Sequence, residues 1–309
     1  MKNNSDCNMQ RRYTFLSRHP AVLLLLVSFF CLAIQSIAFG QSAEFEEDLK
    51  KAAQGDPDAQ FSVGVSYSIG DGIEEDDVKA FEWLSKAAVQ GHSAAQFFIG
   101  DMYENGEGVE RDYTKAVEWH EKAAVQGDAD SQLRLGALYE KGLGVPVNYA
   151  KAMEWYMKSA GQGKVDAQLS LGAMYDKGRG TPRDMRMAAE WYGKAAEKGD
   201  ARGMLAMGFL YLTEDKFFPD YYSARNWFEK AARKKNYEAQ YHLGVLYATG
   251  FGVRRDYVQA HMWFTLCFAF VPDAWDMQRR IEKRMTREEI KKAEKLAREW
   301  KPDPVETKR

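Results

Sequence analysis

Residues 127–163, GDADSQLRLGALYEKGLGVPVNYAKAMEWYMKSAGQG, contain the pattern that decides the fold. Asp128 can cap a first helix, and Gly142 suits the left-handed residue that often follows a helix end. A second helix should run from about Tyr149 to Gln162, because small and aromatic residues recur there at helical spacing. The stretch therefore predicts two helices joined by a short loop.

The same pattern recurs every 36 residues along the chain, with a glycine, a tyrosine three residues later and a tryptophan. Three unrelated residue types that keep one register six times indicate a structural repeat rather than a compositional bias. We therefore predict an all-α solenoid of six 36-residue helix-turn-helix repeats. The motif glycines are Gly64, Gly100, Gly136, Gly172, Gly208 and Gly244, and the tryptophans are Trp83, Trp119, Trp155, Trp191, Trp227 and Trp263.

A glycine inside a helix costs about 1 kcal/mol relative to alanine. Burying a tryptophan or tyrosine removes roughly 150–250 Å² from water, which stabilises a fold by about 4–6 kcal/mol at 25 cal/mol per Å². We therefore expect the motif glycine to let a neighbouring helix or aromatic ring approach closely, and the tryptophan and tyrosine columns to be core. Because ordering the backbone of one repeat costs roughly 36–70 kcal/mol, the repeats must stack into one continuous core.

Both ends of the array are predicted to be capped. Residues 41–55 look like the second half of a degenerate repeat, and the six repeats would span residues 56–270. Arg280 takes the place of the next motif glycine, so the pattern stops there. Residues 271–309 are predicted to form C-terminal capping helices and a basic tail, with a capping box at Thr286 and the glutamate three residues later.

Residues 1–40 are predicted to be an export signal. Arg11 and Arg12 precede an apolar run at residues 21–34, and small residues stand at the two positions that a signal peptidase reads before Gln41. The alternative is an uncleaved anchor in the inner membrane, because the apolar run approaches the roughly 20 residues that span a bilayer. We therefore expect a periplasmic or secreted protein, which would contact a membrane only through an uncleaved leader.

Charge and cysteine content exclude other classes of protein. The chain has 45 acidic and 43 basic residues, and basic residues outnumber acidic ones in the leader and from Arg279 onward, so the body between them is acidic. A nucleic-acid partner is excluded, because it would need a basic face. Cys267 is the only cysteine after the leader, so the mature chain cannot form an intrachain disulfide. Cys267 stands at a small-residue position, and we expect a buried thiol.

No pattern in the chain is typical of a catalytic or metal site. The histidines have no metal-ligand spacing, and no His-Glu-x-x-His occurs. Ser-x-x-Lys and Lys-Thr-Gly, which penicillin-type acyl transfer requires, are also absent. We therefore predict no catalytic residue, no metal ligand and no cofactor.

The full repeat pattern is Ala-x-x-x-Leu-Gly-x-x-Tyr-x-x-Gly-x-Gly followed by Ala-x-x-Trp-x-x-Lys-Ala-Ala-x-x-Gly. With this pattern the chain resembles the Sel-one-like repeat family, relatives of the tetratricopeptide repeats. The resemblance implies a right-handed α/α superhelix that serves as an adaptor or scaffold, often in bacterial envelopes. Some secreted relatives carry a cysteine pair in each repeat and are described as β-lactamase-like or penicillin-binding, whereas repeats one to five here contain no cysteine.

By analogy with tetratricopeptide grooves, the concave face should come from first-helix positions just before and after the motif glycine. These positions predict a groove that is acidic in the middle and more apolar in repeats five and six, which suits a basic or amphipathic peptide. The alternative is a solvated acidic face over ordinary core residues. The candidate partner-binding residues are Phe97, Asp101, Glu104, Leu133, Glu140, Leu169, Asp176, Phe209 and Tyr241.

The sequence therefore predicts a non-catalytic protein–protein interaction scaffold in the bacterial envelope, which binds a protein or peptide on its concave face. Two alternatives stay open. One is a β-lactamase-like or peptidoglycan-acting secreted enzyme, and the other is a cell-wall glycan-binding adaptor.

Overall fold

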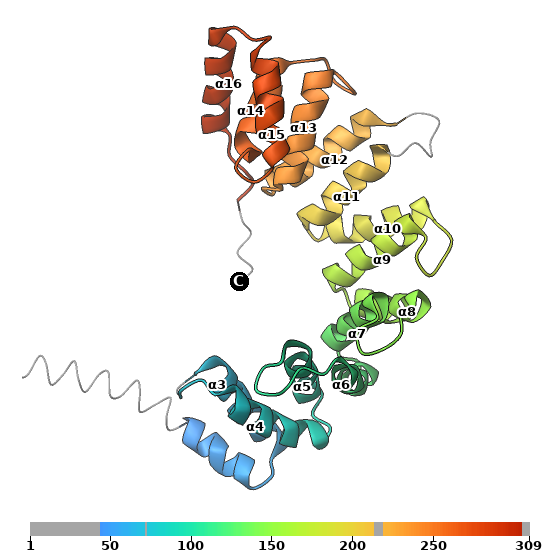
Figure 1. The fold of residues 1–309 in the computed structure, drawn as a ribbon, viewed down its shortest axis with the longest axis vertical. Coiled ribbons are helices and arrows are strands. Elements are labelled where there is room, and N and C mark those ends of the chain that lie inside the picture. Colours follow the sequence, from blue (N-terminus) through green and yellow to red (C-terminus); the bar gives the residue numbers. More distant parts are fainter. Residues whose placement is uncertain (1–43, 72, 213–218, 305–309) are drawn as a thin grey trace, which may run out of the picture. The chain divides into compact units, whose positions relative to one another are not determined.

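A computed structural model of the chain describes residues 44–71, 73–212 and 219–304, so the predicted leader lies outside the described residues. Within these ranges every regular element is a helix and there is no strand, which confirms the predicted all-α class (Figure 1). None of the described helices is long and apolar enough to cross a membrane. The chain divides into two compact units, residues 1–126 and 127–309, and each is described by itself.

The first unit contains the N-terminal helix and two helix pairs. The N-terminal helix includes residues 44–53, and its Phe45 and Leu49 pack against a small core that contains Ala59 and Val63. In the helices that follow, α3 packs against α4, α4 against α5 and α5 against α6. These helices are α3 (Pro57–Ile69), α4 (Asp77–Val89), α5 (Ser93–Asn105) and α6 (Tyr113–Val125).

The second unit contains four helix pairs and two further helices. They are α7 (Ala129–Lys141), α8 (Tyr149–Gly161), α9 (Val165–Lys177), α10 (Met185–Glu197), α11 (Ala201–Leu212), α12 (Tyr221–Arg233), α13 (Tyr237–Thr249), α14 (Tyr257–Cys267), α15 (Pro272–Glu282) and α16 (Arg287–Glu299). Each helix from α7 to α14 packs against the next one, and α15 and α16 both pack against α14. The Trp300 ring meets Trp263 edge-on at 5.8 Å, so the end of α16 covers the last repeat.

Helix boundaries follow the predicted local signals. The Asp128 carboxylate accepts a hydrogen bond from the Ser131 backbone N–H at 2.6 Å, and Gly142 adopts a left-handed φ of 71°. The capping box at Thr286 and Glu289 is also present. These predictions are confirmed, because caps and turn residues act over a few neighbouring positions.

The motif glycine of each repeat lies directly against a side chain of the second helix in that repeat. A Cβ added at Gly136 would lie 2.5 Å from the Tyr156 ring, a distance that real Cβ atoms do not adopt. The expected close approach is confirmed, but the side chain involved is the residue that follows the tryptophan. The pairs are Gly64 with Leu84, Gly100 with His120, Gly136 with Tyr156, Gly172 with Tyr192, Gly208 with Phe228 and Gly244 with Phe264.

The tryptophans differ from the expectation that they are core. Only Trp263 is buried, and the other five are half-buried. In repeats one to five the lysine three residues later covers the exposed side of the ring, with its Nζ 3.7 Å from the ring centre at Trp83 and 4.0 Å at Trp227. The aliphatic stem and the charge of a lysine both favour this position over an aromatic ring.

Two glutamine columns join neighbouring helices, and sequence reasoning did not predict them. The buried Gln96 donates to the Ala88 carbonyl of the preceding repeat at 3.0 Å, and Gln126 donates to the Gln96 side chain at 2.7 Å. Gln60 and Gln90 form the same arrangement in repeat one. Buried amides are stabilising here because their hydrogen bonds are satisfied inside the protein.

We expect Gly172→Ala to destabilise the full chain by about 1–3 kcal/mol, because the new methyl group would have to displace the buried Tyr192 ring, which is 8% exposed. Gly193→Ala on α10 is the matched control, since nothing lies within 4 Å of its added Cβ. Alanine at residue 193 should stabilise the chain by up to about 1 kcal/mol through helix propensity. Urea unfolding measures both changes, and equal stabilities for the two variants would contradict the contact.

A second prediction concerns pH. Burial, with a contribution from the Asp176 carboxylate, raises the pKa of Tyr192 to about 12. In the unfolded chain tyrosine ionises near pH 10, so the folded state loses stability as pH rises from about 10 to about 12. Tyr192→Phe keeps a ring against Gly172 and removes this loss. Between pH 9 and pH 11, the free energy of unfolding of wild type should fall by about 1 kcal/mol relative to that of Tyr192→Phe. Urea unfolding at each pH measures the difference.

Candidate functional site

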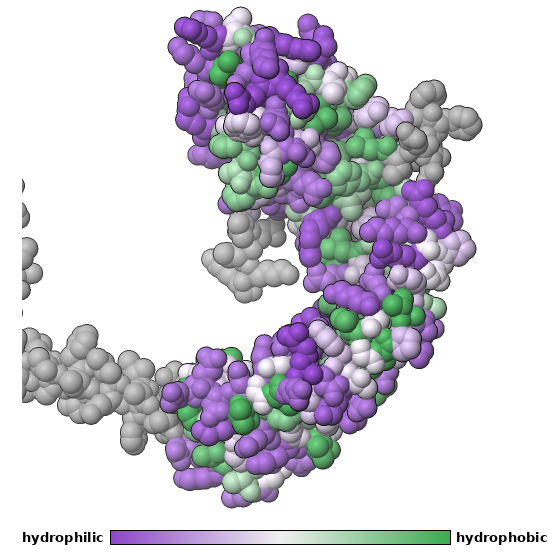
Figure 2. Space-filling view, in the orientation of Figure 1, coloured by the Kyte–Doolittle hydropathy of each residue, from purple (hydrophilic) through white to green (hydrophobic). Residues whose placement is uncertain are grey.

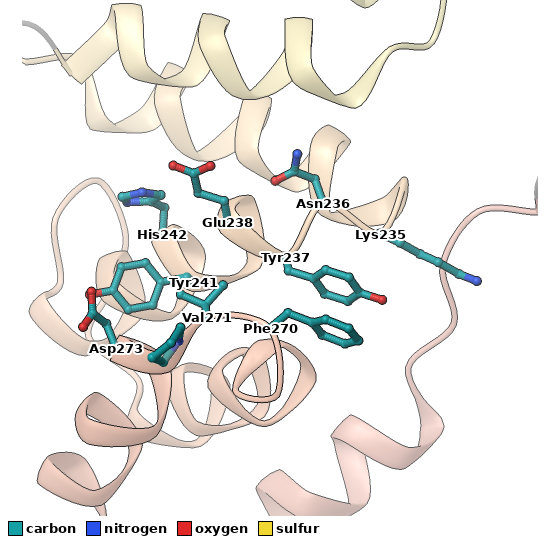
Figure 3. Close-up of a pocket in the computed structure, with 10 residues that line it drawn as sticks. Lys235, Asn236, Tyr237, Glu238, Tyr241, His242, Phe270, Val271 and Asp273 are labelled. Carbon is teal, nitrogen blue, oxygen red and sulfur yellow. The ribbon is translucent and has the colours of Figure 1, made fainter. Parts of the chain in front are cut away.

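An open groove of about 670 Å³ lies where the N-terminal end of α13 meets the loop that leads into α15 (Figure 3). One wall carries Tyr237, Tyr241 and His242 from α13, and the other carries Phe270 and Asp273. The groove is therefore built from the last repeat and from the first residues that follow it. All of its lining residues belong to the second unit.

Stacked aromatic rings form one end of the groove. Tyr237 and Phe270 lie parallel, with ring centres 3.8 Å apart and an interplanar angle of 11° (Figure 3). Phe270 is 62% exposed, and two aromatic residues near it in the sequence, Phe268 and Trp275, are 45% and 49% exposed. Figure 2 shows a mostly hydrophilic visible surface with small hydrophobic patches. Exposed aromatic residues close together in such a surface are typical anchors for a partner.

His242 connects the groove to the core. Its ring stacks on Phe228 at 5.3 Å and meets Phe209 edge-on at 4.7 Å. Burial lowers the pKa of His242, so the imidazole is neutral at pH 7 and contributes an aromatic wall rather than a charge. Tyr241 lies edge-on to His242 at 5.3 Å, on the groove side.

Two carboxylates and one lysine charge the groove. Glu238 and Asp273 line it from opposite walls, and Lys235 lies at the end that holds the Tyr237 and Phe270 rings (Figure 3). Burial and then the Asp273 charge raise the pKa of Tyr241, so its hydroxyl stays protonated and available as a donor. An aromatic surface between two carboxylates can receive a cationic side chain together with the apolar groups beside it.

The groove lies where the repeat pattern breaks. Phe270 takes the place from which Gln90, Gln126 and Gln162 donate to the glutamine of the other column. The corresponding acceptor, the side-chain oxygen of the buried Gln240, consequently has no hydrogen-bond partner among the described residues. A buried acceptor without a partner costs about 1–3 kcal/mol. The same acceptor of Gln168, opposite Lys198, also has no hydrogen-bond partner among the described residues, so Phe270 differs from Lys198 in exposing an aromatic ring at this position.

The backbone at the groove edge departs from the pattern as well. Lys235 has a φ of 61°, and within the described residues every other positive φ belongs to a glycine. The corresponding position in the preceding repeats is Gly91, Gly127, Gly163 and Gly199. A left-handed lysine is energetically unfavourable, and such strain concentrates at functional sites.

The nine predicted partner-binding residues are all partly buried in the structure. Tyr241 lines the groove, and Phe209 lies behind it against His242. Phe97, Asp101 and Glu104 belong to the first unit, where the two carboxylates lie beside His120. The structure thus places Phe209 and Tyr241 against the same ring, that of His242, and groups Asp101 with Glu104 beside His120.

The predicted acidic positions of repeats three and four already have partners within the protein. The Tyr156 hydroxyl donates to Glu140 at 2.9 Å, and Arg179 lies 3.1 Å from the same carboxylate. Asp176 pairs with Arg183 at 3.5 Å. Leu169 packs in a hydrophobic cluster of the second unit, and Leu133 is half-buried. A continuous acidic groove along these repeats stays a prediction.

Sequence reasoning missed Tyr237, His242 and Phe270. The signal that could have found Phe270 is the register itself, because an aromatic residue follows a column of glutamines and lysines. Lys235 could have been found in the same way, because it stands at a position where the preceding repeats have glycine.

Comparison with known proteins assigns the chain to a family. Matches to the Sel1 repeat cover residues 57–92, 93–128, 129–164, 165–200, 201–236 and 238–266. The chain belongs to the Sel1 repeat family. This confirms the predicted resemblance and the solenoid of helix-pair repeats, and members of the family are generally protein-interaction scaffolds. No curated protein matches this Sel1 repeat protein.

Several solved structures are similar to it, and two of them share about a third of their aligned residues with this chain. A protective antigen of uropathogenic Escherichia coli strains, which displays an SLR fold, is 33% identical with a TM-score of 0.74, over 82% of this chain and 55% of the antigen. The chain thus spans about half the length of that antigen. A Sel1 repeat protein from Oxalobacter formigenes is 35% identical with a TM-score of 0.60, over 70% of this chain and 89% of the relative.

Proposed function

We propose that this Sel1 repeat protein is a non-catalytic scaffold of the bacterial envelope, which binds a basic, amphipathic segment of a partner protein in the groove beside Tyr241 and Phe270. The observation that carries the proposal is the break in the repeat pattern at Phe270. An exposed phenylalanine replaces a hydrogen-bonding glutamine and leaves Gln240 without its partner. Loss of local stability in exchange for an exposed aromatic residue is typical of a binding site.

The chemistry of the groove favours a cationic segment with apolar neighbours. Its apolar side chains would pack on the stacked Tyr237 and Phe270 rings, and its arginine or lysine would lie between Glu238 and Asp273. The family supports a protein as the partner. The absence of Ser-x-x-Lys and Lys-Thr-Gly from the sequence supports a non-catalytic role.

Phe270→Gln provides the sharpest test, because it restores the residue type found at this position in repeats one to three. We expect the variant to bind a fluorescein-labelled peptide of alternating leucine and arginine at least about 10-fold more weakly, since it loses an aromatic anchor. The same variant should unfold at higher urea, by about 1 kcal/mol, because the new amide can donate to Gln240. Fluorescence anisotropy and urea unfolding measure the two effects.

The matched control is Phe251→Gln, which removes another exposed phenylalanine, 52% exposed, outside the groove. It should leave peptide binding unchanged. A peptide with glutamate in place of arginine should bind wild type weakly, and Asp273→Lys should reverse this preference. Equal binding of both peptides by wild type, or unchanged binding by Phe270→Gln, would refute the groove as the partner site.

Export is tested separately through the predicted cleavage before Gln41. Expressed with its leader in a Gram-negative host, the protein should appear in the periplasmic fraction with the intact mass of a chain that starts at residue 41. Gly40→Leu places a large residue at the cleavage position and should retain the leader. A wild-type protein that keeps its leader in the membrane fraction would establish the anchored alternative.

A further inference from the structure

Three polar side chains of repeat two meet inside the first unit. Asp101 and Glu104 lie on α5, and His120 lies on α6. The His120 side chain is 0% exposed, and its Nε2 lies 3.8 Å from a carboxylate oxygen of each acidic residue. One nitrogen or oxygen atom from each of the three residues lies within 4.8 Å of the others.

The other repeats do not form this cluster. The position of His120 is Leu84 in repeat one, tyrosine in repeats three and four, and phenylalanine in repeats five and six. The position of Asp101 is valine, alanine or phenylalanine in every other repeat. Two polar replacements thus occur in the same repeat and point toward each other. Replacements that break a structural pattern together indicate a specific role.

The imidazole is not satisfied by the protein around it. Neither ring nitrogen of His120 has a hydrogen-bond partner among the described residues, although the side chain is fully buried. By contrast, Nε2 of the similarly buried His261 forms hydrogen bonds with Glu282 at 3.0 Å and Gln278 at 3.1 Å. The ring of His120 is also fixed in place, since it lies against Gly100, where even a Cβ would clash with it.

The separation of 3.8 Å fits a bound cation. A direct hydrogen bond would bring the atoms to about 2.8 Å, and a bridging water would hold them about 4.6 Å apart. Zinc binds nitrogen and oxygen at about 2.0–2.2 Å, so two of its ligands in a tetrahedral site lie about 3.3–3.6 Å apart, nearer to the observed separation than a direct hydrogen bond or a bridging water. Asp101 and Glu104 are 21% and 22% exposed, so an ion can reach the cluster from solvent.

We propose that Asp101, Glu104 and His120 form a binding site for a divalent transition-metal ion of the Zn²⁺ type. One imidazole nitrogen and two carboxylates suit such an ion, and two carboxylates balance its charge. The ion joins α5 to α6 within repeat two, so binding stabilises the folded chain. Sequence analysis predicted no metal ligand because the three residues form no known motif, and the helix pairing alone brings them together.

The test is a titration of the EDTA-treated full chain with ZnCl₂ by calorimetry, alongside thermal unfolding. Wild type should bind Zn²⁺ at this site and unfold at a temperature a few degrees higher with the ion. His120→Phe keeps the ring found in repeats five and six, and Asp101→Ala places the residue found in repeats three and four. Each should weaken binding at least about 100-fold, because each removes a direct ligand.

His242→Phe is the matched control, since it removes a largely buried histidine of the second unit, and it should bind Zn²⁺ as wild type does. X-ray absorption of the wild-type complex should show one imidazole among oxygen ligands. This readout and Asp101→Ala decide the question if circular dichroism shows that His120→Phe does not fold. The metal site would be refuted if wild type did not bind Zn²⁺, or if folded His120→Phe and Asp101→Ala bound it as tightly as wild type does.

Discussion

The contact between each motif glycine and the side chain opposite sets the geometry of every repeat. A single methyl group at the glycine would overlap the facing ring, so the two helices can approach this closely only with glycine. The facing side chain varies among leucine, histidine, tyrosine and phenylalanine, whereas the glycine is the same in all six repeats. The constraint thus falls on the smaller partner. Because the position that faces the glycine accepts several residue types, repeat two can carry a histidine at the centre of its helix pair.

The helices were predictable because their signals are local. Aspartate caps, left-handed glycines after the first helices and the Thr286 capping box act over three or four residues, and the structure places each of them as expected. The glutamine columns and the lysines over the tryptophans were not predicted. A single glutamine or lysine in a sequence suggests a solvated surface. The role of each glutamine depends on a partner about 30 residues away. The role of each lysine depends on how much of the tryptophan ring stays exposed.

The candidate sites were only partly predictable for the same reason. Tyr241 was found from its place beside a motif glycine, and the structure puts it in the groove. Phe270 was missed, because its meaning comes from the residue that it replaces and from Gln240, which loses a donor. Asp101 and Glu104 were predicted as surface contacts for a partner. Their proximity to His120 requires the pairing of α5 with α6, which spacing along the chain does not reveal.

The glutamine bridges also bear on how an array of this kind can change in length. Gln90 and Gln126 each reach a glutamine 30 residues earlier, so each bridge closes inside a single unit of the pattern. A duplication or deletion of 36 residues preserves the 30-residue spacing between the two positions of each bridge. A shorter insertion within one unit, between its two glutamine positions, would separate the donor of that unit from its acceptor and leave the bridges of the other units intact. Gain or loss of whole units is therefore the change in length that leaves the glutamine bridges intact.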